Sequence, residues 1–114
     1  MDKNKNTRYK PNKDQKAVMM FEGIYRKTLC YDDDNMLCHF TLEKGSSIPL
    51  HCHLAVQNGY VISGRVKFLT ENGDSIIVEP GDGYFFGSNE VHGSEVLEDS
   101  QIIECFSPSR PEYK

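Results

Sequence analysis

Short apolar runs recur from residue 17 onward, and each is ended by a turn sequence rich in Gly, Asn or Asp. Asn72-Gly73 is the strongest of these signals, because this dipeptide is typical of tight β-hairpins. Ser63-Gly64 is a second expected turn, and no segment has convincing helical periodicity. The expected strands are residues 17–21, 24–31, 36–42, 57–62, 65–70, 75–78, 84–86, 91–97 and 101–106. Many short strands in a chain this small predict an all-β sandwich or barrel, whose interior can hold a ligand.

The charge is unevenly distributed along the 114 residues. Residues 1–16 hold six Lys or Arg and two Asp or Glu, whereas residues 17–114 hold seven basic and fifteen acidic residues. We therefore expect a solvated basic arm at 1–16 and a single acidic domain at 17–114. An acidic folded part argues against a nucleic-acid-binding protein.

No apolar run exceeds the five residues of 17–21, so neither a membrane span nor a secretion signal is expected. The four cysteines form no C-x-x-C pair. Without a secretion signal, these residues are expected to be reduced thiols in the cytoplasm.

The chemistry centres on His51-Cys52-His53. Side chains alternate along an extended strand, so His51, His53 and Gln57 can face one interior while Cys52 points away. His92, delivered from elsewhere in the chain, can complete the set. This pattern predicts a metal site.

Converging imidazoles suit a divalent transition metal and leave open positions for a substrate. Three imidazoles and the amide oxygen of Gln57 suit Ni, Zn, Mn or Fe almost equally, and a metal-free site remains the alternative. A neutral amide favours Lewis-acid chemistry over redox cycling. His39, beside Cys38, is expected to be an ordinary surface or core histidine.

Two motifs resemble those of the cupin superfamily. The first, G-x5-H-x-H-x3,4-E-x6-G, is matched by Gly45, His51, His53, Gln57 and Gly64, with Gln57 at the usual glutamate position. The second, centred on P-G-D and ending in histidine, is matched by Pro80-Gly81-Asp82 and His92. The resemblance implies a double-stranded β-helix, or jelly roll, in a single domain that usually forms a homodimer.

The tail from Glu104 to Tyr113 resembles the D-x-F-S-P-x-R-x-x-Y tail of small cupins of the pectin-degradation type, with Glu104 at the aspartate position. Those enzymes open unsaturated uronates into linear keto sugars. The resemblance implies that His51, His53, Gln57 and His92 hold the metal. It also implies that Glu104 and Arg110 are catalytic, that Phe106 shapes the sugar site and that Arg110 pairs with the uronate carboxylate.

The residues themselves allow simpler interpretations. Glu104 and Phe106 share parity, so both can face the interior, where a carboxyl near a cation would be a tuned acid or base. Alternatively, Glu104 lies exposed on an edge strand and Phe106 is only core. Arg110 is either a carboxylate-binding fork or one partner of a surface salt bridge.

The leading hypothesis is a metal-dependent enzyme that opens the ring of a 4,5-unsaturated uronate to give a linear keto-deoxyuronate. A non-catalytic binder of a sugar or carboxylate is the first alternative, and a metal-dependent oxygenase is the second. All three predict a small-molecule partner. Tyr60 should point away from the metal ligands, into a second sheet or a dimer interface.

Overall fold

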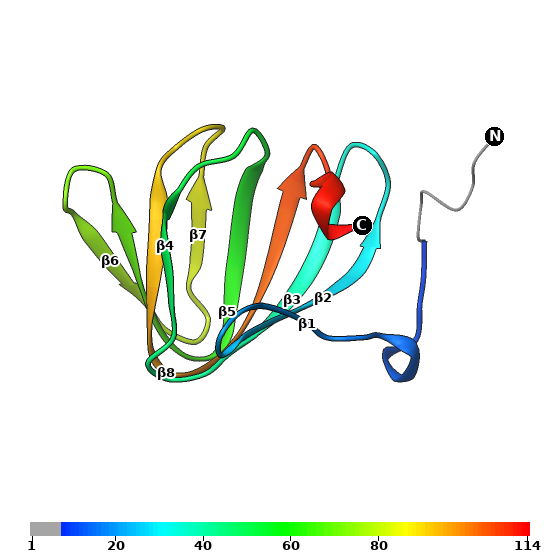
Figure 1. Ribbon diagram of the computed structural model, residues 1–114, viewed down its shortest axis with the longest axis horizontal. Coiled ribbons are helices and arrows are strands. Elements are labelled where there is room, and N and C mark those ends of the chain that lie inside the picture. Colours follow the sequence, from blue (N-terminus) through cyan, green and yellow to red (C-terminus); the bar gives the residue numbers. More distant parts are fainter. Residues whose placement is uncertain (1–7) are drawn as a thin grey trace.

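The computed structural model describes residues 8–114, which form eight strands and two short 3-10 helices (Figure 1). The strands are β1 Val18–Phe21, β2 Ile24–Tyr31, β3 Met36–Leu42, β4 Ser47–His51, β5 Val56–Thr70, β6 Ser75–Val78, β7 Gly83–Phe86 and β8 His92–Ser107. The helices are η2 Asn12–Asp14 and η3 Pro111–Tyr113. The all-β prediction is therefore confirmed.

Two long antiparallel strands, β5 and β8, are shared by both layers of the fold. The first half of β5 pairs with the second half of β8 and with β7, and β3, β2 and β1 extend this layer beyond β8. The second half of β5 pairs with the first half of β8 and with β6, and β4 adds to β8 on the other side. The strands curl around one interior (Figure 1), which is the predicted jelly roll.

The predicted turn at Ser63-Gly64 is wrong, because β5 runs unbroken from Val56 to Thr70. Its pairing with β8 instead shifts register at several points between Val61 and Val66, and β8 is likewise one strand where two were expected. Gly64 has a φ of +92°, and a Cβ there would lie 2.0 Å from Ser100 Oγ. A glycine bulge lets the strand bend from one layer to the other without ending.

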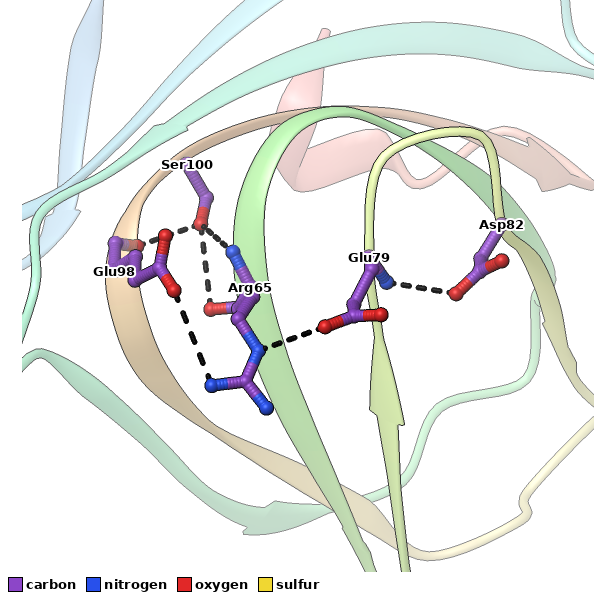
Figure 2. A network of polar contacts seen from close by, with 5 residues as sticks. All are labelled: Arg65, Glu79, Asp82, Glu98 and Ser100. Atoms are coloured by element: carbon purple, nitrogen blue, oxygen red, sulfur yellow. Dashed lines mark hydrogen bonds and ion pairs between the residues drawn. The ribbon is translucent and has the colours of Figure 1, made fainter.

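Polar contacts hold this bend (Figure 2). The Ser100 hydroxyl donates to the Glu98 carbonyl at 2.6 Å and accepts from the Arg65 amide at 3.0 Å. The Arg65 guanidinium forms exposed ion pairs with Glu79 and Glu98, and Asp82 accepts the Glu79 amide at 2.8 Å. Asp82 therefore serves a turn rather than chemistry.

Alternate residues of the strands fill the space between the two layers. On β3, Met36, Cys38, Phe40 and Leu42 are buried, whereas Thr41 is exposed. The same alternation on β5, β7 and β8 contributes Val61, Val66, Phe68, Tyr84, Phe86, Val96, Ile102 and Phe106. This apolar core supports the floor of the cavity described below.

The predicted arm at 1–16 lies partly outside the described residues, which begin at residue 8. Within residues 8–114, no helix has the length and apolar character needed to cross a membrane. The four cysteines, all in this part of the chain, are free thiols.

Candidate metal centre

A cavity of about 400 Å³ lies between the two layers. Side chains from β2, β3, β5 and β8 form an apolar wall that includes Ile24, Phe40, Phe68 and Ile102. Its polar lining includes His51, Gln57, His92, Glu104 and Arg110, which the sequence singled out. Residues from the two motifs and the tail therefore line the same cavity.

The ligand atoms of His51, His53 and His92 lie within 4.8 Å of one another. His51 is the last residue of β4 and pairs with His92, the first residue of β8. His53 lies beyond the end of β4, so the expectation that both histidines of the H-x-H sequence share a strand is wrong. The pairing of β4 with β8 ends at His51 and His92, and the chain leaves the sheet after His51.

Each histidine ring is anchored through Nδ1 to a backbone carbonyl. The contacts are His51 to Pro49 at 2.9 Å, His53 to Ala55 at 2.7 Å and His92 to Glu90 at 2.8 Å. A carbonyl oxygen can only accept, so each Nδ1 carries a hydrogen and each neutral ring keeps its lone pair on Nε2. This arrangement orients imidazoles as metal ligands.

His92 provides the test of whether the residues fit a metal. Its Nε2 atom is buried and has no hydrogen-bond partner within residues 8–114, and its ring stacks on Phe86 at 4.4 Å. Burial lowers the pKa of His92, and burial followed by the charge of Arg110 lowers the pKa of His53. Neutral imidazoles with an unsatisfied buried nitrogen fit a divalent cation.

Gln57 is buried beside this cluster, on β5. Its Oε1 lies 2.9 Å from His53 Nε2, and its Nε2 donates to Glu104 Oε2 at 2.9 Å. The bond to Glu104 turns the amide so that its oxygen faces the histidines. The amide oxygen of Gln57, which is the atom that can bind a metal, therefore points toward the histidines.

Glu104 lies on β8, between β3 and β5, and is only 5% exposed, so the exposed-edge interpretation is wrong. Tyr84 donates its hydroxyl to Glu104 Oε2 at 2.6 Å. Burial raises the pKa of Glu104 to about 7, although the hydrogen bonds from Tyr84 and Gln57 and the charge of Arg110 oppose the rise. A carboxyl with this pKa can exchange a proton near neutral pH.

Arg110 follows β8, and its side chain is 14% exposed. It donates to the Tyr113 hydroxyl at 2.8 Å and pairs with the exposed Glu112 at 3.0 Å, while its buried Nε has no hydrogen-bond partner among the described residues 8–114. Its guanidinium lies over the rings of Phe106 and Tyr113. The salt-bridge interpretation is therefore incomplete, because the charged group also lines the cavity.

A sequence model of the cupin domain matches residues 38–105 of the chain. The chain belongs to the cupin family. The pectin degradation protein KdgF of Dickeya dadantii (strain 3937) is 35% identical over 94 residues, covering 81% of this chain and 84% of that protein.

Two solved structures resemble this cupin over nearly its whole length. KdgF from Halomonas sp. superposes with a TM-score of 0.84 at 29% identity, covering 93% of this chain and 99% of that one. An RmlC-like cupin from Shewanella frigidimarina superposes with a TM-score of 0.89 at 21% identity, covering 96% and 99% of the two chains. The likeness to the RmlC-like cupin shows the fold alone, whereas the likeness to KdgF from Halomonas sp. combines a similar fold with a similar sequence.

Four further residues from the sequence analysis lie either at the site or on the surface of this cupin. They are Phe106, His39, Cys52 and Tyr60. Phe106 is 1% exposed, and its ring packs edge-on against His53, so it is both core and cavity wall. His39 bonds Gln101 at 3.1 Å, outside the histidine cluster, as expected. Cys52 is exposed and is not part of that cluster, and Tyr60 is half exposed.

Sequence reasoning missed Arg26, a buried cation that forms no ion pair within residues 8–114. Its guanidinium lies 4.2 Å from the centroid of the Tyr113 ring, the same distance as that of Arg110. Arg26 also donates a hydrogen bond to the Thr28 hydroxyl, which in turn donates to the Tyr113 carbonyl at 2.6 Å. The sequence offered a signal for Arg26. Ile24, Arg26 and Thr28 are each two residues apart, so they share one face of the predicted strand.

Proposed function

We propose that this cupin is a divalent-metal-dependent enzyme that opens the ring of a 4,5-unsaturated uronate to a linear keto-deoxyuronate. The observation that carries the proposal is the buried Glu104, with a pKa near 7, hydrogen-bonded to Gln57 in the cavity that Arg110 also lines. Similarity to two KdgF proteins, one named for pectin degradation, supports the choice of substrate class.

His51, His53, His92 and Gln57 would hold the metal, because their free nitrogen and oxygen atoms converge. Bound there, a divalent ion supplies Lewis-acid polarisation of substrate oxygens. The carbonyl anchors on the three Nδ1 atoms keep the rings in place, so little reorganisation accompanies metal binding.

Glu104 moves the protons. Ring opening removes the proton of the anomeric hydroxyl, breaks the ring C–O bond as a carbonyl forms, and adds a proton to carbon in the released enolate, whose oxygen becomes that of the keto group. A carboxyl near pKa 7 is populated in both protonation states at neutral pH, so one group can accept the first proton and deliver the second. Its burial keeps this exchange away from bulk water.

Arg110 binds the substrate carboxylate through its planar guanidinium. The ion pair with Glu112 occupies part of that fork at present, and the Glu112 side chain is 58% exposed. A substrate carboxylate can therefore displace Glu112, because the Glu112 side chain is already largely exposed to solvent and loses little on leaving the pair.

The test is turnover of an unsaturated monouronate by protein loaded with Ni, Zn, Mn or Fe, followed by loss of the enol absorbance. Wild type and the matched control His39→Ala should be active, whereas His92→Ala should lose both metal and activity. Rates no better than buffer with all four metals would refute the proposed reaction. In that case a rise in melting temperature with uronates would identify a binder, and oxygen uptake with iron would identify an oxygenase.

We also propose that this cupin is a cytoplasmic homodimer whose partners are small molecules rather than nucleic acid or membrane. Tyr60, Ile62 and Phe85 are exposed apolar side chains on β5 and β7, which supports a covered face, and free thiols suit a reducing compartment. Light scattering on the purified protein should give twice the chain mass. A monomer mass at micromolar concentration would exclude the dimer.

A further inference from the structure

Three neighbouring strands place Tyr84, Gly59 and Glu104 in one row. Gly59 on β5 pairs with Tyr84 on β7 and with Glu104 on β8. Strands two apart are separated by about 10 Å, so only long side chains can meet across the one between them. Tyr84 and Glu104 do so, with the hydroxyl 2.6 Å from Oε2.

The contact runs directly over Gly59. A Cβ on this residue would lie 2.2 Å from Tyr84 Cζ and 2.3 Å from its hydroxyl oxygen. Gly59 is in a strand and does not have the positive φ of the turn glycines. What this position requires is therefore the missing side chain rather than backbone freedom.

The two oxygens of Glu104 have different surroundings. Oε2 accepts from both the Tyr84 hydroxyl and the Gln57 amide. Oε1 makes no hydrogen bond with any part of the chain between residues 8 and 114, and Glu104 lines the cavity. Two donors on one oxygen fix the plane of the carboxyl and leave the other oxygen for a bound molecule.

We propose that Tyr84 is a positioning residue that reaches across Gly59 to orient the Glu104 carboxyl, with Oε1 available to the substrate. The effect on turnover rests on the proposed uronate reaction, whereas the orientation of the carboxyl does not. Proton transfer depends on distances of a few tenths of an ångström, so a carboxyl that is held by the Gln57 amide alone lowers the rate while leaving substrate binding intact.

The first test is the kinetics of Tyr84→Phe, which removes one oxygen atom and keeps the ring. We expect kcat to fall about 10-fold or more, with KM within about twofold and the metal content unchanged. Tyr60→Phe, which removes the hydroxyl of a half-exposed tyrosine on β5, should match wild type. An unchanged kcat in Tyr84→Phe, or a loss shared equally by Tyr60→Phe, would overturn the proposal.

Gly59→Ala is the second variant, and it displaces the Tyr84 ring instead of shortening it. It should reproduce the kcat loss of Tyr84→Phe. The double variant should have a kcat only slightly lower than that of Tyr84→Phe, because both changes break the same contact. Full kcat in folded Gly59→Ala protein would contradict the proposed geometry.

Crystal structures of wild type and Tyr84→Phe provide a readout independent of activity. The Glu104 carboxyl should occupy one orientation in wild type. In the variant it should be rotated or should occupy two alternate conformations. A carboxyl that stays in place without the Tyr84 hydroxyl would overturn the positioning role. If wild type opens no uronate, the proposed function fails, and these structures still decide the role of Tyr84.

Discussion

The carboxamide oxygen of Gln57 lies 2.9 Å from Nε2 of His53, although both atoms are hydrogen-bond acceptors in the neutral site. His53 must keep its hydrogen on Nδ1, which faces the Ala55 carbonyl. While Glu104 is ionised, it holds the NH2 group of Gln57 on its own side. Two lone pairs facing each other repel, and a cation that binds both removes the repulsion.

Divalent metal should therefore stabilise this cupin markedly. At free metal about 100 times its Kd, the free energy of unfolding should rise by about 3 kcal/mol. His51→Ala should abolish the rise, whereas His39→Ala should retain it, since His39 lies outside the cluster. Thermal denaturation with and without chelator measures the effect, and an equal response in both variants would exclude this metal site.

Gln57→Glu should bind metal more tightly but weaken the metal-free fold. The new carboxyl lacks the NH2 donor and faces the Glu104 carboxyl, so the two groups repel when both are ionised and otherwise must share a proton. Burying this repulsion should cost about 1–3 kcal/mol in unfolding free energy. Urea denaturation of chelated protein and calorimetric metal titration measure the two effects, and a metal-free variant as stable as wild type would contradict the Gln57–Glu104 contact.

The pH dependence of stability in the metal-free protein should carry the signature of Glu104. Its pKa is raised by burial from 4.5 to about 7, so the folded state holds this proton more tightly than the unfolded state. The resulting stabilisation is complete below pH 4.5 and is lost as the pH rises through 7, a change of about 3 kcal/mol.

Glu104→Gln removes this titration, so it should gain stability relative to wild type between pH 5 and 8. Urea denaturation across this pH range measures the difference. Parallel pH profiles for the two proteins would show that Glu104 has an ordinary pKa.

Arg110→Lys should raise KM for an unsaturated uronate about 10-fold, because lysine keeps the charge but loses the planar fork. The change also removes the stacking on Phe106 and Tyr113. Arg65→Lys, at an exposed pair of salt bridges, is the matched control and should leave KM unchanged. Equal KM values for Arg110→Lys and wild type would place the carboxylate elsewhere.

Gly64→Ala should destabilise the fold more than Gly73→Ala does. Both glycines have φ near +90°, which costs alanine about 1–2 kcal/mol. At Gly73 a Cβ meets nothing within 4 Å, whereas at Gly64 it lies 2.4 Å from the Asp99 carbonyl. Chemical denaturation of the two variants isolates the clash, and equal losses would mean that the β5 bend yields easily.

Local patterns in the sequence predicted most of the strands, most of the turns and the cupin motifs. Alternation placed Phe106 and Glu104 on the same face of their strand, and motif spacing selected the histidines and Gln57. These features depend on residues near one another in the chain, so they can be read without the fold.

Only the tertiary structure decided how distant segments meet. Nothing local predicted that His53 would join His51 and His92 from beyond its strand, or that Arg26 would lie against Tyr113. The row from Tyr84 across Gly59 to Glu104 arises from the registers of three strands. Register is set by the packing of the whole sheet, because a one-residue slip would turn every side chain to the opposite face.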